Sequence, residues 1–286
     1  MTTIADYLVA STELLAAAGV PSPQADAELL LGHVLSLRRG EVQAQLILGT
    51  ELSTTAEAAA DAALARRAAR EPLQHITGRA AFRSIELAVG PGVFVPRPET
   101  EQVAQFAVDA LRVVPGARPL AVDLGTGSGA IALSLAAEVP HSLVYGVEKS
   151  PSAFEWASGN RELVGVDNAR ILLGDLADAL PELDGTVDVV ISNPPYIPND
   201  AVPRDPEVRL FDPELALYGG ADGLDVVRQV SQTAARLLHP GGTLVLEHGE
   251  LQGPSIAALL RADGWSAVAT HPDLLGRDRA TTAIRR

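Results

Sequence analysis

From about residue 98 to the end of the chain, apolar segments of strand length alternate with segments of helical periodicity. This alternation predicts a mostly parallel sheet covered by helices on both faces, which is the α/β class. In such a sheet, ligands bind at the carboxyl ends of the strands, near the point where the strand order reverses. Motifs that directly follow a strand are therefore the first candidates for a functional site. The expected strands are residues 120–124, 142–147, 169–173, 187–192, 243–247, 266–270 and 281–284.

The first part of the chain has a different pattern, which predicts a small bundle of short helices. Apolar residues recur at helical spacing in residues 4–18 and 29–37, and an alanine-rich run extends over residues 58–69. Thr54 and Glu57 have the spacing of a capping box, which marks the start of a helix in front of this run.

A short segment between the two patterns favours a hairpin or a pair of short strands. Residues 81–95 alternate apolar and polar around Gly90-Pro91-Gly92. We therefore expect a helical bundle over residues 1–80, a hairpin linker over residues 81–97 and an α/β domain over residues 98–286.

Composition and charge disfavour several classes of function. The net charge is −14, of which residues 86–286 carry −12, so direct binding to a nucleic-acid backbone is disfavoured. The chain has no cysteine, and its six histidines do not have metal-ligand spacing, so we expect no metal site. Neither a membrane-spanning run nor a signal-peptide pattern is present, so we expect no membrane association and a cytoplasmic location.

A glycine-rich turn follows the strand at 120–124 and precedes an expected helix. It consists of Gly125, Thr126, Gly127, Ser128 and Gly129. Glycine lets the backbone approach a ligand closely, and a helix start offers free N–H groups. The G-x-G-x-G spacing differs from that of dinucleotide folds and from that of a P-loop. Taken alone, the turn could still be only structural.

Glu148 ends the next strand along the chain. A lone glutamate at a strand end is more often a solvated charge. Combined with the glycine-rich turn, however, it favours hydrogen bonds to both hydroxyls of a ribose. The two features together predict a nucleoside cofactor and leave its identity open.

The most informative motif is Asn193-Pro194-Pro195-Tyr196, directly after the strand at 187–192. The prolines fix the backbone, so that its carbonyls can point in set directions. The Asn193 side-chain oxygen and the Pro194 carbonyl can accept the two hydrogens of a planar NH2 group, while the Tyr196 ring packs against its plane. Such contacts favour nitrogen lone-pair character and in-line attack on a sulfonium methyl. A rigid turn with a core tyrosine is the structural alternative.

The chain resembles class I, Rossmann-like S-adenosylmethionine-dependent methyltransferases that act on amide or amine nitrogens. The resemblance rests on Asp123–Gly129 together with Asn193–Tyr196. More narrowly, the chain is similar to the HemK/PrmC family of release factor glutamine N5-methyltransferases. Further stretches typical of that family are residues 72–78, 94–101, 216–223, 247–252 and 273–279, so the match spans nearly the whole chain.

The resemblance implies a cofactor, a substrate and a role for each motif. S-adenosylmethionine would be held by Gly125–Gly129, Glu148 and Asn193. The side-chain amide of glutamine in the GGQ motif of a peptide-chain release factor would be held by Asn193–Tyr196. Our own hypothesis is that the helical bundle and the hairpin near Gly90 position that protein substrate.

The chain departs from the family pattern at two cofactor positions. Glu148 stands where members often have aspartate, which keeps the ribose contact with a longer arm. Leu176 stands where some members have an aromatic residue, so the adenine contact there would be aliphatic or main-chain. Arg97, Glu99 and Glu101 fit either a structural ion-pair cluster or a wall of the active site.

Three other functions compete with this interpretation. A nucleic-acid adenine N6-methyltransferase would use the same motif, but it needs a basic docking surface. A nicotinamide-dependent dehydrogenase has a different glycine spacing and no use for Asn-Pro-Pro-Tyr. The third alternative, a non-catalytic ribosome-associated protein with a methyltransferase fold, can be distinguished from an active enzyme only by an activity assay.

Overall fold

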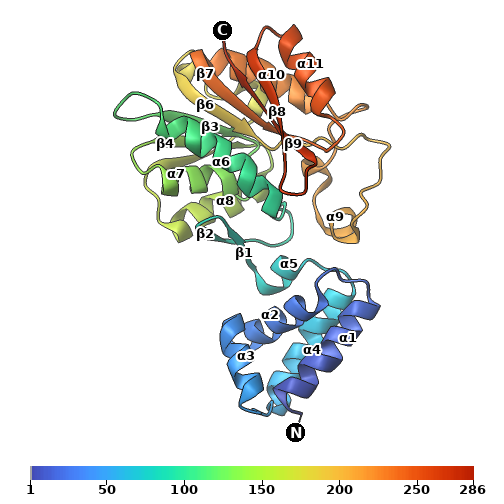
Figure 1. Ribbon diagram of the computed structural model, residues 1–286. Helices are drawn as coiled ribbons and strands as arrows, with labels where there is room; N and C mark the ends of the chain where they lie inside the picture. The colour runs from blue at the N-terminus through green and yellow to red at the C-terminus, as the bar shows by residue number, and fades with distance from the viewer. Residues whose placement is uncertain (1) are drawn as a thin grey trace. The chain divides into compact units, whose positions relative to one another are not determined.

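The computed structural model describes residues 2–286, which form two compact units. The first unit, here the helical unit, contains the residues up to Arg79 together with Arg204–Phe211. The second, here the catalytic unit, contains Ala80–Pro203 and Asp212–Arg286. The chain therefore passes between the two units three times. The colours of Figure 1 follow the order of the elements along the chain.

The helical unit is built around a small apolar core in which Ile4, Leu15, Leu31 and Val42 are almost fully buried. Its helices are α1 (Ile4–Ala17), α2 (Pro23–Leu35), α3 (Arg39–Ile47), α4 (Thr54–Ala68) and α5 (Leu73–Thr77), together with the distant α9 (Pro206–Phe211). The predicted bundle is thus confirmed.

The predicted cap of α4 is wrong by one residue. Ser53 is the N-cap, and its hydroxyl accepts the N–H of Ala56, because Thr54 already takes the first helical position. Glu57 accepts a hydrogen bond from the Thr2 hydroxyl instead of closing a capping box.

The catalytic unit contains a seven-stranded sheet in the order β5-β4-β3-β6-β7-β9-β8. The strands β3 to β7 are parallel, and β9 runs antiparallel to both β7 and β8, which confirms the predicted mostly parallel sheet. The strand bounds are β3 (Leu120–Leu124), β4 (Leu143–Glu148), β5 (Ala169–Leu173), β6 (Val187–Ser192), β7 (Leu238–Glu247), β8 (Ser266–Pro272) and β9 (Asp278–Ile284).

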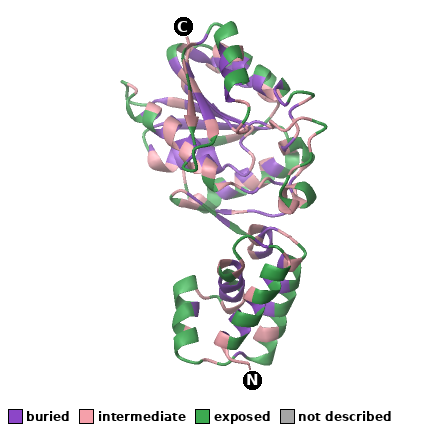
Figure 2. Cartoon of the chain, turned by 45° about the vertical axis from the view of Figure 1, so that its right-hand side comes forward, coloured by how far each residue is buried: buried purple, intermediate pink, exposed green. Residues whose placement is uncertain are grey.

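Helices cover both faces of this sheet because alternate strand residues are apolar on each side. Ile191 and Val245 point into the core shared with α6 (Pro98–Arg112), α7 (Ala130–Glu138) and α8 (Pro151–Val164). Val190 and Leu244 point into the other core, shared with α10 (Asp225–Leu237) and α11 (Gly253–Ala262). Figure 2 shows the sheet and the inner faces of these helices as buried. Three short 3₁₀ helices complete the unit: η1 (Leu176–Asp178), η2 (Pro181–Leu183) and η3 (Glu214–Ala216).

A hairpin is present in this region, but its strands and its turn lie earlier in the chain than predicted. Strands β1 (Arg79–Phe82) and β2 (Ile85–Ala88) are joined at residues 83–84, not at Gly90-Pro91-Gly92. The two glycines serve packing instead, since a Cβ at Gly90 would lie 2.8 Å from the Trp156 ring and one at Gly92 would lie 2.5 Å from Ser152 Oγ.

Among residues 2–286, none of the helices has the length and apolar character needed to cross a lipid bilayer.

Candidate functional site

The predicted motifs meet at the point where the strand order of the sheet reverses. From β3 the chain moves outward to β4 and β5, and it then returns to the other side of β3 as β6. Open parallel sheets bind their ligands at such a reversal, beyond the carboxyl ends of the strands. The Ser192 hydroxyl, at the end of β6, donates to the Leu124 carbonyl at the end of β3 over 2.6 Å. The glycine-rich turn and the Asn193 motif therefore begin side by side.

The glycine-rich turn has a backbone that other residues would find strained. Gly125, Gly127 and Gly129 have φ values of 79°, 58° and 85°, in the left-handed region. The N–H groups of Gly125 and Thr126 donate to the Val147 carbonyl over 2.8 and 3.0 Å, which ties the turn to β4. A Cβ on Gly125 or Gly127 would meet nothing within 4 Å, so open space adjoins the turn.

Glu148 lies against this turn with only 8% of its surface exposed. Its two carboxylate oxygens accept the N–H groups of Gly127, over 2.8 Å, and of Ser150, over 2.7 Å. Because each carboxylate oxygen can accept more than one hydrogen bond, both remain able to bind hydroxyl groups. The oriented carboxylate beside an open glycine turn fits the ribose of a nucleoside cofactor.

Leu176 begins η1 directly after β5 and is partly buried against the core beneath α10. Asp175 caps this turn through the Ala177 N–H, over 3.0 Å, and forms an ion pair with Lys149. The leucine therefore presents an aliphatic surface at the end of a strand that neighbours β4.

Asp123 belongs to a motif that carries the resemblance, but the sequence predicted no role for it. It is fully buried in β3, where one carboxylate oxygen accepts the Thr126 hydroxyl over 2.5 Å and the Ala132 N–H over 3.2 Å. The other oxygen, Oδ1, has no hydrogen-bond partner among the described residues. Burial raises the pKa of this carboxyl to about 7. An acidic residue inside an otherwise apolar strand was the available signal.

Asn160 is a second residue without a predicted role. From the buried side of α8, its side-chain nitrogen donates to the carbonyls of Ser128 and Ala88, each over 2.9 Å. Its oxygen accepts the Ala88 N–H over 2.7 Å. One side chain thus holds the glycine-rich turn against β2.

The Asn193 motif is held in place by segments that follow it in the sequence. Ile197 donates its N–H to the Leu217 carbonyl, and Gly219 donates to the Ile197 carbonyl, both over 2.9 Å. The Gln252 side chain donates to the Tyr196 carbonyl over 2.9 Å. These bonds fix the backbone of the motif from outside the sheet.

Two glycines explain why residues 216–223 are typical of the family. A Cβ at Gly219 would lie 2.4 Å from the Pro195 carbonyl oxygen, and one at Gly223 would lie 2.3 Å from the Tyr196 carbonyl oxygen. Real Cβ atoms do not approach oxygen this closely, so only glycine lets the two segments pack together.

Within the motif, Pro194 is buried while Asn193 and Tyr196 are half-buried. The Asn193 side chain has no hydrogen bond to another described residue, so its amide is free to bind a substrate. Burial, together with the charge of Glu247, raises the pKa of Tyr196 to about 12, so its hydroxyl is neutral at physiological pH.

Glu247 is a further buried carboxyl at the same edge of the sheet. It is the last residue of β7. Leu246 of β7 pairs with Ser192 of β6, so Glu247 and Asn193 are the residues that directly follow this pair on the two neighbouring strands. Its side chain is 1% exposed, and its Oε2 atom has no hydrogen-bond partner in the described part of the chain. Burial raises the pKa of Glu247 to about 7, although the charges of Arg279 and Arg97 oppose that change.

Arg97 belongs to an ion pair, whereas Glu99 and Glu101 have no resolved role. The Arg97 guanidinium contacts the fully buried carboxylate of Asp212 over 2.5 Å and lies 4.8 Å from the centre of the Phe94 ring. Burial raises the pKa of Asp212 to about 6. Arg97 and Asp212 therefore join the start of α6 to the segment that follows α9.

No group of three or more His, Asp or Glu side chains in residues 2–286 is arranged to hold a metal ion.

Known methyltransferases share the fold of the catalytic unit. A family model described as a methyltransferase domain matches residues 120–268. A 16S rRNA methyltransferase from T. thermophilus, solved with AdoMet and guanosine, is similar with a TM-score of 0.53 and 24% identity, over 73% of this chain and 50% of that one. A Pyrococcus furiosus methyltransferase is similar with a TM-score of 0.50 and 22% identity, over 69% of this chain and 87% of that one. The protein is thus a methyltransferase of the class that uses S-adenosylmethionine, as the motifs predicted.

Relatives of one family match both units of the chain. Residues 6–78 match the model described as the PrmC N-terminal domain. A release factor glutamine methyltransferase from Streptomyces coelicolor is 51% identical over 96% of this chain and 95% of its own length. Another, from Bifidobacterium longum, is 46% identical over 98% of this chain and 99% of its own length. The chain belongs to the release factor glutamine methyltransferase family, which confirms the resemblance.

One relative has a different substrate in its name. A 4-amino-L-phenylalanine/4-methylamino-L-phenylalanine methyltransferase from Streptomyces pristinaespiralis is 41% identical over 99% of this chain and 95% of its own length.

Proposed function

We propose that this protein transfers a methyl group from S-adenosylmethionine to the side-chain amide nitrogen of glutamine in the GGQ motif of a peptide-chain release factor. The observation that carries the proposal is the Asn193-Pro194-Pro195-Tyr196 motif beside the glycine-rich turn, at the reversal of the strand order. The relatives named as release factor glutamine methyltransferases support the choice of substrate.

In this proposal, the cofactor is held by the residues after β3, β4 and β5. Glu148 accepts the ribose hydroxyls, the turn Gly125–Gly129 lets the cofactor approach the backbone, and Leu176 packs against the adenine. S-adenosylmethionine supplies an electrophilic methyl group on a sulfonium. Asp123 keeps the turn in shape through Thr126.

The substrate amide is held by the motif after β6. An amide nitrogen is a poor nucleophile because its lone pair is conjugated with the carbonyl. The Asn193 side-chain oxygen and the Pro194 carbonyl accept its two hydrogens, and the Tyr196 ring covers one face of the amide plane. These contacts orient the nitrogen lone pair toward the methyl group. As the carbon–nitrogen bond forms, the carbon–sulfur bond would break with its electron pair left on sulfur as a neutral thioether, and one of the two N–H protons would pass to solvent. Pro195 fixes the direction of the carbonyl before it.

The helical unit is proposed to recognise the release factor, since it contributes none of the motif residues. Because the proposed substrate acts in translation, the proposal also places the enzyme in the cytoplasm.

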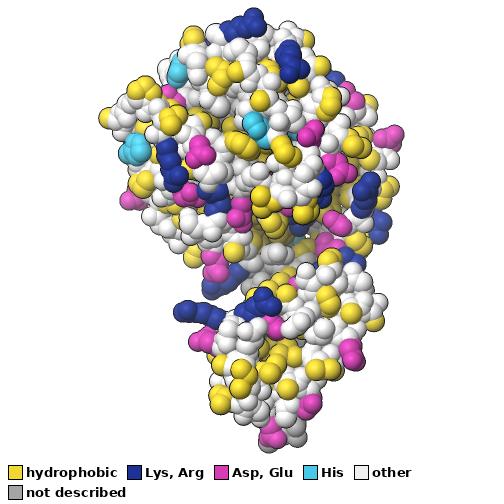
Figure 3. Space-filling view, in the orientation of Figure 1, with side chains coloured by type: hydrophobic (Ala, Val, Ile, Leu, Met, Phe, Trp, Pro, Cys, Tyr) yellow, Lys and Arg dark blue, Asp and Glu magenta, His cyan; other side chains and the backbone are white. Residues whose placement is uncertain are grey.

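A specific observation supports one competing substrate: the relative that is named for an aromatic amine. An arylamine NH2 group is planar and could use the same two acceptors. Nucleic-acid adenine is less well supported, because residues 86–286 carry a net charge of −12. On the visible face of the catalytic unit, Lys and Arg side chains are scattered among acidic ones (Figure 3).

Incubation with radiolabelled S-adenosylmethionine tests the proposal directly. Purified release factor, free 4-amino-L-phenylalanine and adenine-containing nucleic acid are offered in separate reactions, and the labelled residue is mapped by mass spectrometry. We expect label on the release factor glutamine alone. Label only on the arylamine or the nucleic acid would contradict the proposed substrate, and no label anywhere would favour a non-catalytic role.

A further inference from the structure

The short helix α9 belongs to the helical unit, although the chain on both sides of it belongs to the catalytic unit. The segment leaves the catalytic unit after Pro203, soon after the Asn193 motif, and returns at Asp212. None of the residues of α9 is buried, and Leu210 is 60% exposed. Fully buried apolar side chains therefore do not account for the attachment of α9 to the helical unit.

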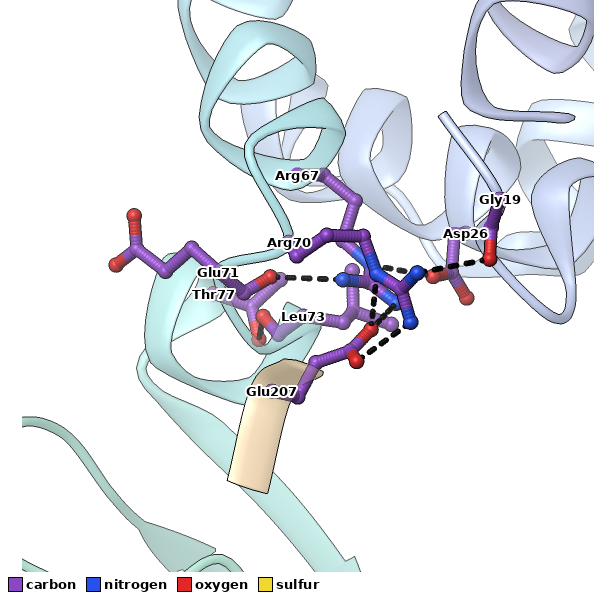
Figure 4. A network of polar contacts seen from close by, with 8 residues as sticks. All are labelled: Gly19, Asp26, Arg67, Arg70, Glu71, Leu73, Thr77 and Glu207. Carbon is purple, nitrogen blue, oxygen red and sulfur yellow. Dashed lines mark hydrogen bonds and ion pairs between the residues drawn. The ribbon is translucent and has the colours of Figure 1, made fainter. Parts of the chain in front are cut away.

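Glu207 supplies that attachment through Arg67, in the last turn of α4, and Arg70, just after that helix (Figure 4). Arg70 binds its carboxylate with two parallel bonds, from Nη2 over 2.6 Å and from Nε over 2.9 Å. Arg67 Nη2 donates to the same carboxylate over 2.9 Å. A two-pronged guanidinium–carboxylate contact is both stronger and more directional than a simple ion pair.

The two arginines are themselves fixed within the helical unit. Arg67 also binds Asp26 of α2 over 2.7 Å and the Glu71 carbonyl over 3.0 Å, and Arg70 binds the Gly19 carbonyl over 3.0 Å. The side chains of Arg67, Arg70 and Glu207 are only 6%, 18% and 13% exposed, so water screens this network far less than it screens a surface ion pair.

The charge state of Glu207 agrees with this geometry. Burial works to raise its pKa, but the hydrogen bonds from Arg70 and Arg67 outweigh burial and lower that pKa. Glu207 is therefore ionised at neutral pH and holds α9 as a charged group.

The chain on both sides of α9 is anchored in the catalytic unit near the Asn193 motif. Before α9, Ile197 and Asn199 bond to the backbone of residues 217 and 220. After α9, the buried carboxylate of Asp212 pairs with Arg97. With α9 held by Glu207, three chain crossings join the units. If α9 were released, only the crossing at Arg79 and Ala80 would still connect the helical core to the catalytic unit.

We propose that Glu207 is a positioning residue for the protein substrate, because its contacts with Arg67 and Arg70 tether the substrate-binding helical unit to the chain that continues from the Asn193 motif. This inference rests on the proposed function. A release factor held by the helical unit presents its glutamine to the amide pocket at an effective concentration that the tether sets. A short glutamine peptide, which contacts only the pocket, gains nothing from the tether.

The test compares Glu207→Gln with Glu214→Gln, a matched control in the exposed start of η3. For each, kcat and KM are measured with intact release factor and with a short GGQ peptide, and S-adenosylmethionine binding is measured by calorimetry. We expect Glu207→Gln to lower kcat/KM for the release factor at least about tenfold, mainly through KM, with peptide methylation and cofactor binding unchanged. Glu214→Gln should match the wild type, and Glu207→Asp should restore part of the lost activity.

Hydrogen exchange of residues 204–211 gives a readout that does not depend on the substrate. Glu207→Gln and Arg70→Gln should each speed exchange there, and the double variant should add little to either change. Unchanged exchange in Glu207→Gln, or equal losses on release factor and peptide, would overturn the inference. A wild-type enzyme that leaves release factor unmethylated would instead refute the proposed function, while exchange would still report on the tether.

Discussion

Replacing Asn193 by alanine tests the proposed amide pocket most directly. In the pocket, two acceptors share the substrate NH2 group, and the substitution leaves only the Pro194 carbonyl. Loss of one preorganised polar contact in an active site typically lowers the rate about 10²–10³-fold, which corresponds to about 2.7–4 kcal/mol of transition-state stabilisation. We therefore expect Asn193→Ala to lose nearly all methyl transfer to glutamine.

The structure also predicts what this substitution leaves intact. The Asn193 side chain has no hydrogen bond within the described protein and is half-buried, so the free energy of unfolding should change by less than about 1 kcal/mol. Cofactor affinity should fall little, because the proposed cofactor contacts lie mainly after β3 and β4. Tyr196→Phe should be milder than Asn193→Ala, since the ring face remains and only a neutral hydroxyl is lost.

Single-turnover transfer from labelled S-adenosylmethionine to saturating release factor measures the effect on the chemical step. Circular dichroism and thermal unfolding establish that the variants are folded, and calorimetry gives their cofactor affinity. Asp200→Ala is a control, because Asp200 is exposed in the same loop and its side chain has no hydrogen bond or ion pair to another described residue. A folded Asn193→Ala enzyme that methylates glutamine at close to the wild-type rate would refute the amide-pocket mechanism.

Three further predictions concern the residues around the pocket. Glu148→Ala should weaken S-adenosylmethionine binding by roughly 1.5–3 kcal/mol in calorimetry through loss of charge-assisted hydrogen bonds; wild-type affinity in the variant would argue against a ribose contact. Gly219→Ala should lower methyl transfer at least about tenfold while cofactor binding persists, because its Cβ would lie 2.4 Å from the Pro195 carbonyl oxygen and displace the motif. Gly159→Ala, where a Cβ meets nothing within 4 Å, should have no such effect. Burial raises the pKa of Glu247 from 4.5 to about 7. Between these pH values the unfolded chain releases a proton that the folded protein retains. The Glu247 carboxyl therefore disfavours folding increasingly as pH rises through that range. In urea unfolding, Glu247→Gln should therefore be more stable than the wild type by about 1–3 kcal/mol at pH 8 and nearly equal to it at pH 4; a pH-independent difference would contradict this.

The bounds of a strand were predictable where turn residues lie on both sides of an apolar run. Residues 120–124, 169–173 and 187–192 were predicted with the bounds that the structure has for β3, β5 and β6. Because the chemistry of a parallel sheet collects at the carboxyl ends of its strands, the placement of the predicted motifs followed from these bounds. The roles assigned to the individual site residues remain predictions.

Features that depend on distant contacts were not predictable. The predicted position of the hairpin turn was wrong because Gly90 is not part of the turn that joins the two strands. It packs against the Trp156 ring, 66 residues further along the chain, where a Cβ would not fit. The place of α9 in the helical unit depends on ion pairs between Glu207 and arginines 137 and 140 residues away. Glu247 lies in a stretch typical of the family, but its burial had no signal, since a glutamate at a strand end is interpreted as a solvated charge until the packing around it is known.

The arrangement of the strands limits how far the two reacting groups can drift apart. The proposed cofactor contacts follow β3 and β4, whereas the amide pocket follows β6, and β3 pairs directly with both neighbours. The Ser192 hydroxyl adds a bond from the end of β6 to the end of β3. Relative motion of pocket and cofactor would therefore have to break sheet hydrogen bonds in the core of the unit. In the proposed function, the rigid sheet thus holds the methyl group and the nitrogen in line, and the helical unit with its proposed tether at Glu207 recognises the protein substrate.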